Sequence, residues 1–314
     1  MRLLFCGTPE FAVPSLRALL SDPRFHVAGV ITQPDRPRGR GLESGQSAVK
    51  QVAAVAGVEV FQPLKIRAPE AREWIARKAP EAVVLIAYGQ IVPAALLSFP
   101  RLGWINLHAS LLPKYRGAAP IAWAIANGEV RTGLTTMQID AGMDTGAVLL
   151  RRQLEIAAGE TAPELSTRLA QAGAPLVIET LLGLERGALI PQPQDHAQAT
   201  YAPLLKREDG RISWASSANR IFNRMRAFAP WPGAYAQFRD ARVQLWGRPW
   251  TPAQAGAPAP APPGVILVAD GLLLVACGEA TWLQVTDVQP EGRRRVTARE
   301  FVSGARLTNG ERFE

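Results

Sequence analysis

The first half of the chain alternates short apolar runs with segments of helical periodicity, and this pattern limits the fold more than any other feature. The apolar runs are continuous, which is typical of strands buried on both faces of a sheet. They are Leu3–Cys6, Val27–Thr32, Ala82–Ala87, Trp104–Ala109 and Leu134–Ile139. The helices expected beside them are Phe11–Ser21, Ala48–Ala56, Pro69–Lys78, Ala118–Asn127 and, last and longest, about Ala162 to Arg186. The pattern predicts a mostly parallel sheet with helices on both faces, and a ligand crevice at the carboxyl ends of its strands.

The second half follows a different pattern. A polar, proline-containing stretch predicts a linker over residues 189–205, which leaves 1–188 and 206–314 as two domains. Short strand-like pieces then recur around Ile212, Tyr235–Phe238, Val243–Trp246, Gly264–Leu267, Leu272–Cys277 and Leu283–Val288. Several short strands with turn signals over about a hundred residues predict a small β-barrel resembling an oligonucleotide-binding fold.

The charge and the cysteine content of the chain indicate which class of partner and which cellular compartment to expect. The 314 residues carry a net charge of +8, of which residues 206–314 hold +5. This excess favours an anionic partner, although an arginine-rich composition alone has the same effect. Cys6 and Cys277 lie in separate apolar runs, so we expect reduced core thiols and no metal site. Without a signal-peptide pattern or an apolar run long enough for a bilayer, we expect a cytoplasmic protein, and by default a monomer.

The strand at Trp104–Ala109 carries two polar side chains in an apolar setting. Alternate residues of a strand share a face, so Asn106 and His108 are expected to point the same way. An amide and an imidazole at the carboxyl end of a strand can stabilise a developing oxyanion, and the imidazole can also move a proton near neutral pH. The same residues also fit a buried structural histidine beside a structural asparagine.

A glycine-rich turn at 140–146 adds two carboxylates, Asp140 and Asp144, after the fifth strand. Such a turn can bring a carboxylate to a histidine on a neighbouring strand and orient the ring. It can also be an ordinary Asx turn with solvated carboxylates. The spacing does not decide which aspartate would act.

The turn after the first strand, Gly7-Thr8-Pro9-Glu10-Phe11, argues against a dinucleotide enzyme. It lacks the glycines that allow a backbone to approach a pyrophosphate, and it is not a P-loop. The sheet can therefore be doubly wound without a nicotinamide cofactor.

With these segments in order, the chain resembles the methionyl-tRNA formyltransferase family from end to end. Elements of the Asn-x-His and Asp-Thr-Gly type belong to folate-dependent formyltransferases in general. The Gln-Pro-Asp-Arg-Pro segment and the matching segments of the second half narrow the resemblance to the family that acts on tRNA. The matching segments are 5–9, 32–37, 87–93, 106–108, 110–120, 140–146, 201–202, 211–214 and 226–232.

The resemblance implies a Rossmann-like catalytic domain, a tRNA-binding barrel resembling an OB-fold, and 10-formyltetrahydrofolate as the formyl donor. It also implies that Asn106 and His108 polarise the formyl oxygen and that Asp144 orients His108 and helps to move the proton. The residues that match the folate-binding positions are Ser110, Leu111, Leu112, Pro113, Leu85, Ile86, Tyr88, Gly89 and Gln90.

For initiator Met-tRNA, the resemblance points to the long polar segment 33–47 and to its arginines Arg36, Arg38 and Arg40. The lysines usual in the family after Gly41 are replaced here by Leu42-Glu43-Ser44-Gly45, a departure from the family pattern. Further arginines at 220, 224, 226 and 293–295 fit either phosphate contacts or a solvated face.

Three other functions share parts of this pattern. A related enzyme could formylate another amine, such as a sugar nucleotide or a glycinamide of purine synthesis. A tRNA-binding protein could have lost catalysis, although Asn106, His108 and Asp144 are all present. Hydrolysis of formyl-folate would use similar chemistry and is not distinguished by the residues.

Overall fold

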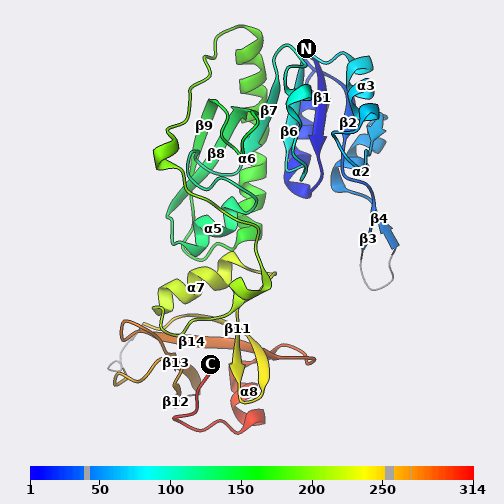
Figure 1. The fold of residues 1–314 in the computed structure, drawn as a ribbon. Coiled ribbons are helices and arrows are strands. Elements are labelled where there is room, and N and C mark those ends of the chain that lie inside the picture. Colours follow the sequence, from blue (N-terminus) through cyan, green and yellow to red (C-terminus); the bar gives the residue numbers. More distant parts are fainter. Residues whose placement is uncertain (39–42, 252–257, 270) are drawn as a thin grey trace. The chain divides into compact units, whose positions relative to one another are not determined.

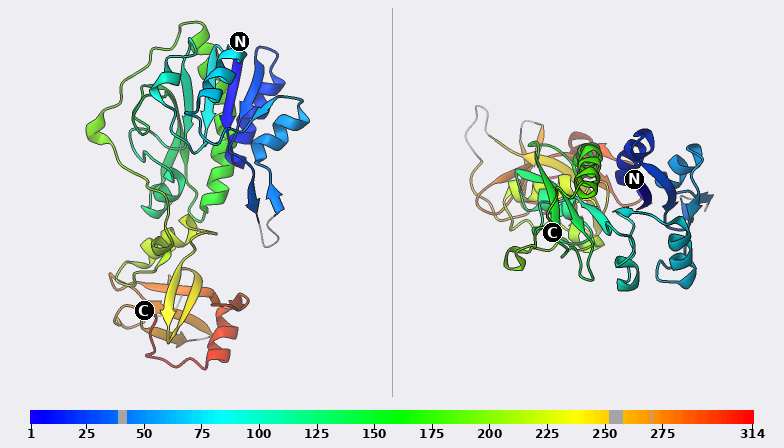
Figure 2. Two further views of the ribbon diagram at one scale, coloured as in Figure 1. Left: turned by 45° about the vertical axis from the view of Figure 1, so that its right-hand side comes forward. Right: turned by 90° about the horizontal axis from the view of Figure 1, so that it is seen from above.

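The computed structural model describes residues 1–38, 43–251, 258–269 and 271–314, and the chain divides into two compact units (Figures 1 and 2). The first unit comprises Met1–Pro120, Arg131–Glu155 and Glu164–Pro203. The second comprises Ile121–Val130, Ile156–Pro163 and Leu204–Glu314. The predicted boundaries at 188 and 206 stay a prediction. Among the described residues, no helix has both the length and the apolar character needed to cross a membrane.

A seven-stranded sheet forms the centre of the first unit, in the order β5-β2-β1-β6-β7-β8-β9. The first five strands in that order run parallel, whereas β7–β8 and β8–β9 pair antiparallel. Their bounds are β1 Arg2–Gly7, β2 His26–Ile31, β5 Val60–Phe61, β6 Ala82–Ile86, β7 Trp104–His108, β8 Arg131–Gln138 and β9 Val148–Glu155. The five predicted strands are confirmed to within a few residues, and β5 and β9 are additional.

Helices cover both faces of this sheet, as predicted. On one face, Trp74 of α3 packs with Leu4, Cys6 and Trp104 in a buried cluster. On the other, α6 passes so close to β7 that a Cβ on its Gly173 would lie 2.5 Å from Leu107. The helices of residues 1–203 are η1 Glu10–Ala12, α1 Val13–Ser21, α2 Ala48–Val55, α3 Pro69–Lys78, α4 Ala94–Leu97, α5 Pro120–Ala126, α6 Ala162–Glu185 and η2 His196–Gln198. Of these, α5 belongs, apart from Pro120, to the second unit.

Two short strands occur in the segment 33–47, where the sequence shows no periodicity. They are β3 (Arg36–Arg38) and β4 (Glu43–Gly45), paired antiparallel. Strands of three residues are too short for an alternating pattern to be read from the sequence.

The second unit is built on an antiparallel sheet in the order β10-β11-β14-β13-β12, with β15 paired to β14. Its elements are η3 Arg207–Gly210, α7 Ala218–Ala227, β10 Tyr235–Phe238, β11 Ala241–Pro249, β12 Ile266–Ala269, β13 Leu272–Ala276, β14 Trp282–Pro290, β15 Val296–Thr297 and α8 Ala298–Ala305. The small antiparallel domain predicted from the sequence is confirmed. The prediction of a strand around Ile212 is wrong: Ile212 donates one backbone hydrogen bond to the carbonyl oxygen of Tyr235, and Arg211 forms an isolated bridge with the same residue.

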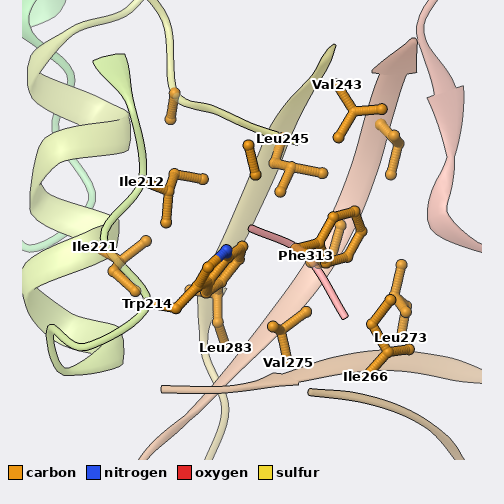
Figure 3. Close-up of a cluster of buried hydrophobic side chains, with 14 of the residues drawn as sticks. Ile212, Trp214, Ile221, Val243, Leu245, Ile266, Leu273, Val275, Leu283 and Phe313 are labelled. Carbon is orange, nitrogen blue, oxygen red and sulfur yellow. The ribbon is translucent and has the colours of Figure 1, made fainter. Parts of the chain in front are cut away.

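Apolar side chains from the sheet, α7 and the last residues of the chain form the core of this unit (Figure 3). Trp214 stacks on Phe313 with ring centroids 5.8 Å apart, and both rings lie among Leu245, Val275 and Leu283. The second unit thus has a hydrophobic core of its own, as a separate compact unit requires.

Candidate active site

Strand β7 presents Asn106 and His108 on the same face of the sheet. Both are almost fully buried, with exposed fractions of 8% and 6%. Asn106 lies between Leu85 of β6 and Met137 of β8, and His108 pairs with Thr135 of β8. The predicted placement of the amide and the imidazole at the carboxyl end of a buried strand is therefore what the fold produces.

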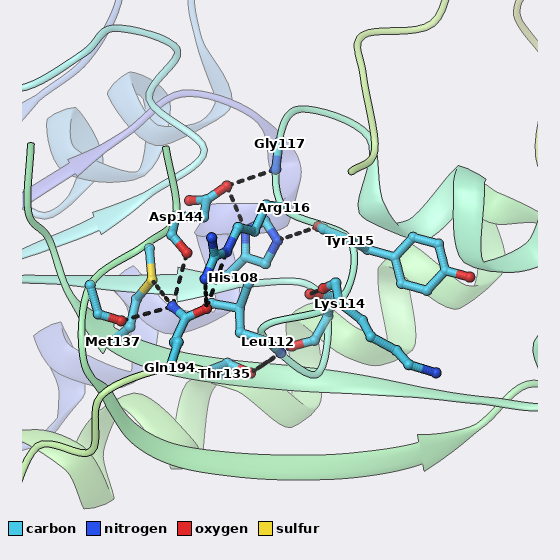
Figure 4. A network of polar contacts seen from close by, with 12 residues as sticks. His108, Leu112, Lys114, Tyr115, Arg116, Gly117, Thr135, Met137, Asp144 and Gln194 are labelled. Atoms are coloured by element: carbon cyan, nitrogen blue, oxygen red, sulfur yellow. Dashed lines mark hydrogen bonds and ion pairs between the residues drawn. The ribbon is translucent and has the colours of Figure 1, made fainter. Parts of the chain in front are cut away.

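The imidazole of His108 contacts two groups, one at each nitrogen (Figure 4). Its Nε2 lies 2.8 Å from the carbonyl oxygen of Tyr115, and its Nδ1 lies 3.6 Å from Oδ2 of Asp144. A carbonyl oxygen can only accept, so this contact places a proton on Nε2. In the neutral ring, the lone pair is then on Nδ1 and faces the carboxylate of Asp144.

The two aspartates of the 140–146 turn have different roles. Oδ1 of the exposed Asp140 accepts from the backbone N–H of Gly142 (3.0 Å) and from Oγ1 of Thr145 (2.6 Å), and so closes the turn. Asp144 has a left-handed backbone, with φ of 54°, and its Oδ2 accepts from the N–H of Gly117 at 2.8 Å. The geometry thus selects Asp144 as the carboxylate that faces His108, which the spacing alone left open.

Two buried residues that hold the Asp144 turn, Gln194 and Arg116, are not predicted from the sequence. Gln194 donates from its Nε2 to the carbonyl oxygens of Asp144 (2.9 Å) and Gly146 (2.8 Å). Its Oε1 accepts from Nη2 and Nε of Arg116, at 2.7 and 3.2 Å, and Arg116 is only 2% exposed. Gln194 falls in the stretch predicted as a linker, and no pattern there marks it as part of a site.

The segment after β7 is held compactly against β8. Oγ of the fully buried Ser110 donates to the carbonyl oxygen of Lys114 at 2.6 Å. Oγ1 of Thr135 accepts from the N–H of Leu112 (3.1 Å) and donates to the carbonyl oxygen of Ser110 (2.7 Å). Residues 110–113 therefore leave the strand in a fixed conformation directly beside His108.

A cleft of about 1090 Å³ opens at the carboxyl ends of β1, β2 and β6. Of the residues predicted to bind folate, Tyr88, Gly89 and Gln90 line it. Leu85 and Ile86 lie in β6 just before them, whereas residues 110–113 do not line it. The cleft wall is fixed by Gln33, which donates to the carbonyl oxygen of Tyr88 at 3.0 Å. The fold thus gives the crevice where parallel sheets usually bind ligands.

The structure describes some, but not all, of the arginines predicted to contact tRNA. Arg36 and Arg38 lie in β3, and Arg40 lies outside the described residues. In the second unit, Arg226 is 8% exposed and donates to the carbonyl oxygen of Glu160 at 2.9 Å. Burial lowers the pKa of its guanidinium. Arg226 is therefore a buried structural group and matches neither of the two roles considered for it.

Family models and individual relatives point to the same protein family. A family model described as formyl transferase matches residues 1–181, and one described as formyl transferase, C-terminal domain, matches residues 204–306. The chain is 52% identical over 314 residues to a methionyl-tRNA formyltransferase of Solibacter usitatus, covering 100% of this chain and 98% of that one. It is 50% identical to a methionyl-tRNA formyltransferase of Acidobacterium capsulatum, covering 98% and 97%.

Solved structures share the fold at much lower identity. A sugar 3N-formyl transferase, determined in the presence of dTDP and 5-N-formyl-THF, has a TM-score of 0.66 at 16% identity, covering 94% of this chain and 99% of that one. A methionyl-tRNA formyltransferase from Clostridium thermocellum has a TM-score of 0.57 at 17% identity, covering 88% and 100%. At such identities the likeness concerns the fold alone.

Proposed function

The chain belongs to the methionyl-tRNA formyltransferase family, and on that premise we propose that it transfers the formyl group of 10-formyltetrahydrofolate to the free amino group of methionine on initiator Met-tRNA. The observation that carries the proposal within the structure is the pairing of His108 with Asp144 at 3.6 Å, with Asn106 on the same strand face. We propose that these three side chains carry out the transfer.

The reaction joins the methionine nitrogen to the formyl carbon and breaks the bond from that carbon to N10 of the folate. Attack by the neutral amine creates a negative oxygen and a positive nitrogen in one step. We propose that the amide of Asn106 polarises the formyl oxygen, and that His108, once protonated, adds its positive charge to this stabilisation. The proton lost by the amine ends on N10 of the departing tetrahydrofolate.

The contacts of His108 support Nδ1 as the atom that takes up this proton. Because the carbonyl oxygen of Tyr115 occupies Nε2, the free lone pair of the neutral ring is on Nδ1. A proton taken up there lies between the ring and the carboxylate of Asp144, which stabilises the imidazolium. Asp144 thus acts through the ring, in line with the role that the family resemblance implies.

We propose that two segments of the first unit bind the folate. Residues 85–90 end in the wall of the cleft, and residues 110–113 follow the strand that carries His108. Leu85 pairs directly with Asn106 across β6 and β7, so the first segment begins beside the proposed catalytic strand. We further propose that Arg36, Arg38 and Arg40 contact the tRNA, that the protein acts as a monomer, and that the reaction takes place in the cytoplasm with the other steps of translation initiation.

The experiment that tests the proposal is transfer of radiolabelled formyl from 10-formyltetrahydrofolate to charged initiator Met-tRNA. Charged elongator Met-tRNA and uncharged initiator tRNA serve as matched controls. We expect label on charged initiator Met-tRNA alone, in an amide stable to mild acid. Absence of label from a protein that still binds formyl-folate would overturn the tRNA assignment and favour another amine acceptor. Free formate without transfer would favour hydrolysis.

A further inference from the structure

Asp144 is held in place by two residues from distant parts of the first unit. Gln194 bonds the backbone on both sides of Thr145, through the carbonyl oxygens of Asp144 and Gly146. Arg116 bonds the oxygen of the same amide through two of its nitrogens. Figure 4 shows Gln194 between Arg116 and the Asp144 turn, so that one amide side chain joins the two.

The segment that carries Arg116 contacts both proposed catalytic side chains. Its preceding residue, Tyr115, accepts from His108, and its following residue, Gly117, donates to the carboxylate of Asp144. The contacts therefore form a closed ring that runs from His108 through residues 115–117 to Gln194 and Asp144, and back to His108. A displacement at any one position changes the distance between the imidazole and the carboxylate.

The geometry fixes the direction of each hydrogen bond in this ring. A guanidinium can only donate, so Oε1 of Gln194 must accept from Arg116, and the amide nitrogen must point to the two carbonyl oxygens. Arg116 is 2% exposed, and its other side-chain partner is Nδ1 of His196 at 3.2 Å. A buried cation that loses an acceptor is costly, so the amide is held in this orientation.

The backbone brings Gln194 to this position. Gln192 exchanges two hydrogen bonds of 2.8 Å with Val148, at the start of β9. Farther along, Arg116 donates its N–H to the carbonyl oxygen of Thr200 (2.8 Å) and accepts from the N–H of Ala202 (2.7 Å). Residues 192–202, the return segment, are thus fastened at both ends to the elements that they orient.

We propose that Gln194, held by Arg116, is a positioning residue for formyl transfer that sets the place of Asp144 relative to His108. The inference rests on the proposed function. Gln194 does not contact the reacting atoms, and its effect passes through the backbone of the 140–146 turn. Geometry of this kind matters because a misplacement of about 1 Å at a catalytic group can cost on the order of 100-fold in rate.

The test is a double-mutant cycle of Gln194→Glu with Asp144→Asn. Glutamate keeps the shape and the acceptor for Arg116, but it sets a carboxylate oxygen against two carbonyl oxygens. We expect Gln194→Glu to lower kcat by about 10- to 100-fold with the KM for both substrates changed by less than about threefold. In the Asp144→Asn background, the same change should lower kcat by less than about threefold, because the route through the carboxylate is already lost. An equal factor in both backgrounds would overturn the proposal.

A matched control and a readout without catalysis complete the test. Gln198→Ala removes an exposed amide of the same segment, which donates to the side chain of Asp195, and it should leave kcat within about twofold. The chain has three histidines, so His108 is assignable by NMR from a His108→Gln sample. Gln194→Glu should shift the His108 ring resonances and Gln198→Ala should not. This readout holds even if the acceptor is not tRNA, and an unmoved His108 signal would contradict the inference.

If the Gln194→Glu variant does not fold, Gln194→Met replaces it in the double-mutant cycle with Asp144→Asn. Methionine fills a similar volume without donors, acceptors or charge. Thermal unfolding of each variant shows whether it is folded before kcat is compared. Wild-type kcat retained in folded Gln194→Met would overturn the proposal independently of the glutamate variant.

Discussion

Nδ1 of His108 and Oδ2 of Asp144 lie 3.6 Å apart, and the same short segment contacts both side chains. The carbonyl oxygen of Tyr115 accepts from the ring, and the N–H of Gly117 donates to the carboxylate. The separation is longer than a normal hydrogen bond. Catalytic contacts of unliganded enzymes often tighten only with substrate, so the pair is close enough to share a proton during the reaction.

Loss of the imidazole should abolish most of the transfer. We expect His108→Ala to lower kcat by about 100- to 10,000-fold, because the proton acceptor of the proposed mechanism is removed. Formyl-folate binding should remain, and the circular dichroism spectrum should be that of the wild type. His26→Ala is the matched control, since His26 is exposed at the start of β2. Full activity of His108→Ala would exclude the mechanism.

Replacing Asp144 with asparagine should separate the effect of its charge on kcat from the effect of its shape. Asp144→Asn keeps an oxygen that can accept from Gly117 but loses the negative charge beside the ring. We expect kcat to fall by about 100-fold or more, with a folded protein. Asp140→Asn changes the other carboxylate of the same turn and should stay within about threefold of the wild type. Equal losses for the two variants would show that the turn, and not the charge of Asp144, is needed.

The glycine that ends the turn has no room for a side chain. A Cβ on Gly146 would lie 1.7 Å from the carbonyl oxygen of Gln138, and backbone atoms cannot move aside as a side chain can. We expect Gly146→Ala to lower the free energy of unfolding by about 1–3 kcal/mol and to reduce kcat by displacing Asp144. Gly304→Ala, in α8 with open space around it, should instead be neutral or stabilising by up to about 1 kcal/mol. Chemical denaturation of both variants measures the difference.

Both thiols should be unreactive in the folded protein. Burial raises the pKa of Cys277 to about 12 and also raises that of Cys6. Since the thiolate is the reactive form and burial disfavours it, Cys277 is almost entirely in the thiol form at pH 8. Iodoacetamide at that pH should label neither residue until denaturant is added, as mass spectrometry would show. Rapid labelling of the native protein at either position would contradict this burial.

Local periodicity accounts for what could be predicted. The buried strands of the first unit read as continuous apolar runs, and alternation within Trp104–His108 is enough to place Asn106 and His108 on one face. The return segment could not be found this way, because Gln194 meets Arg116 only through the path of the chain after α6. One missed element did carry a signal: α8 begins with a capping box between Thr297 and Glu300, a spacing visible in the sequence.

The hydrogen bonds that hold residues 192–202 also affect how truncated fragments of the chain should be designed. A fragment cut at residue 188, where the sequence suggests that a domain ends, would lose Gln194 and leave the guanidinium of Arg116 buried without its main acceptor. Such a truncation is expected to be inactive because its aspartate is no longer held, whatever its affinity for RNA. An inactive fragment of that length would therefore not be evidence that the residues after 203 take part in catalysis, and a fragment made to test them has to keep residues 192–202.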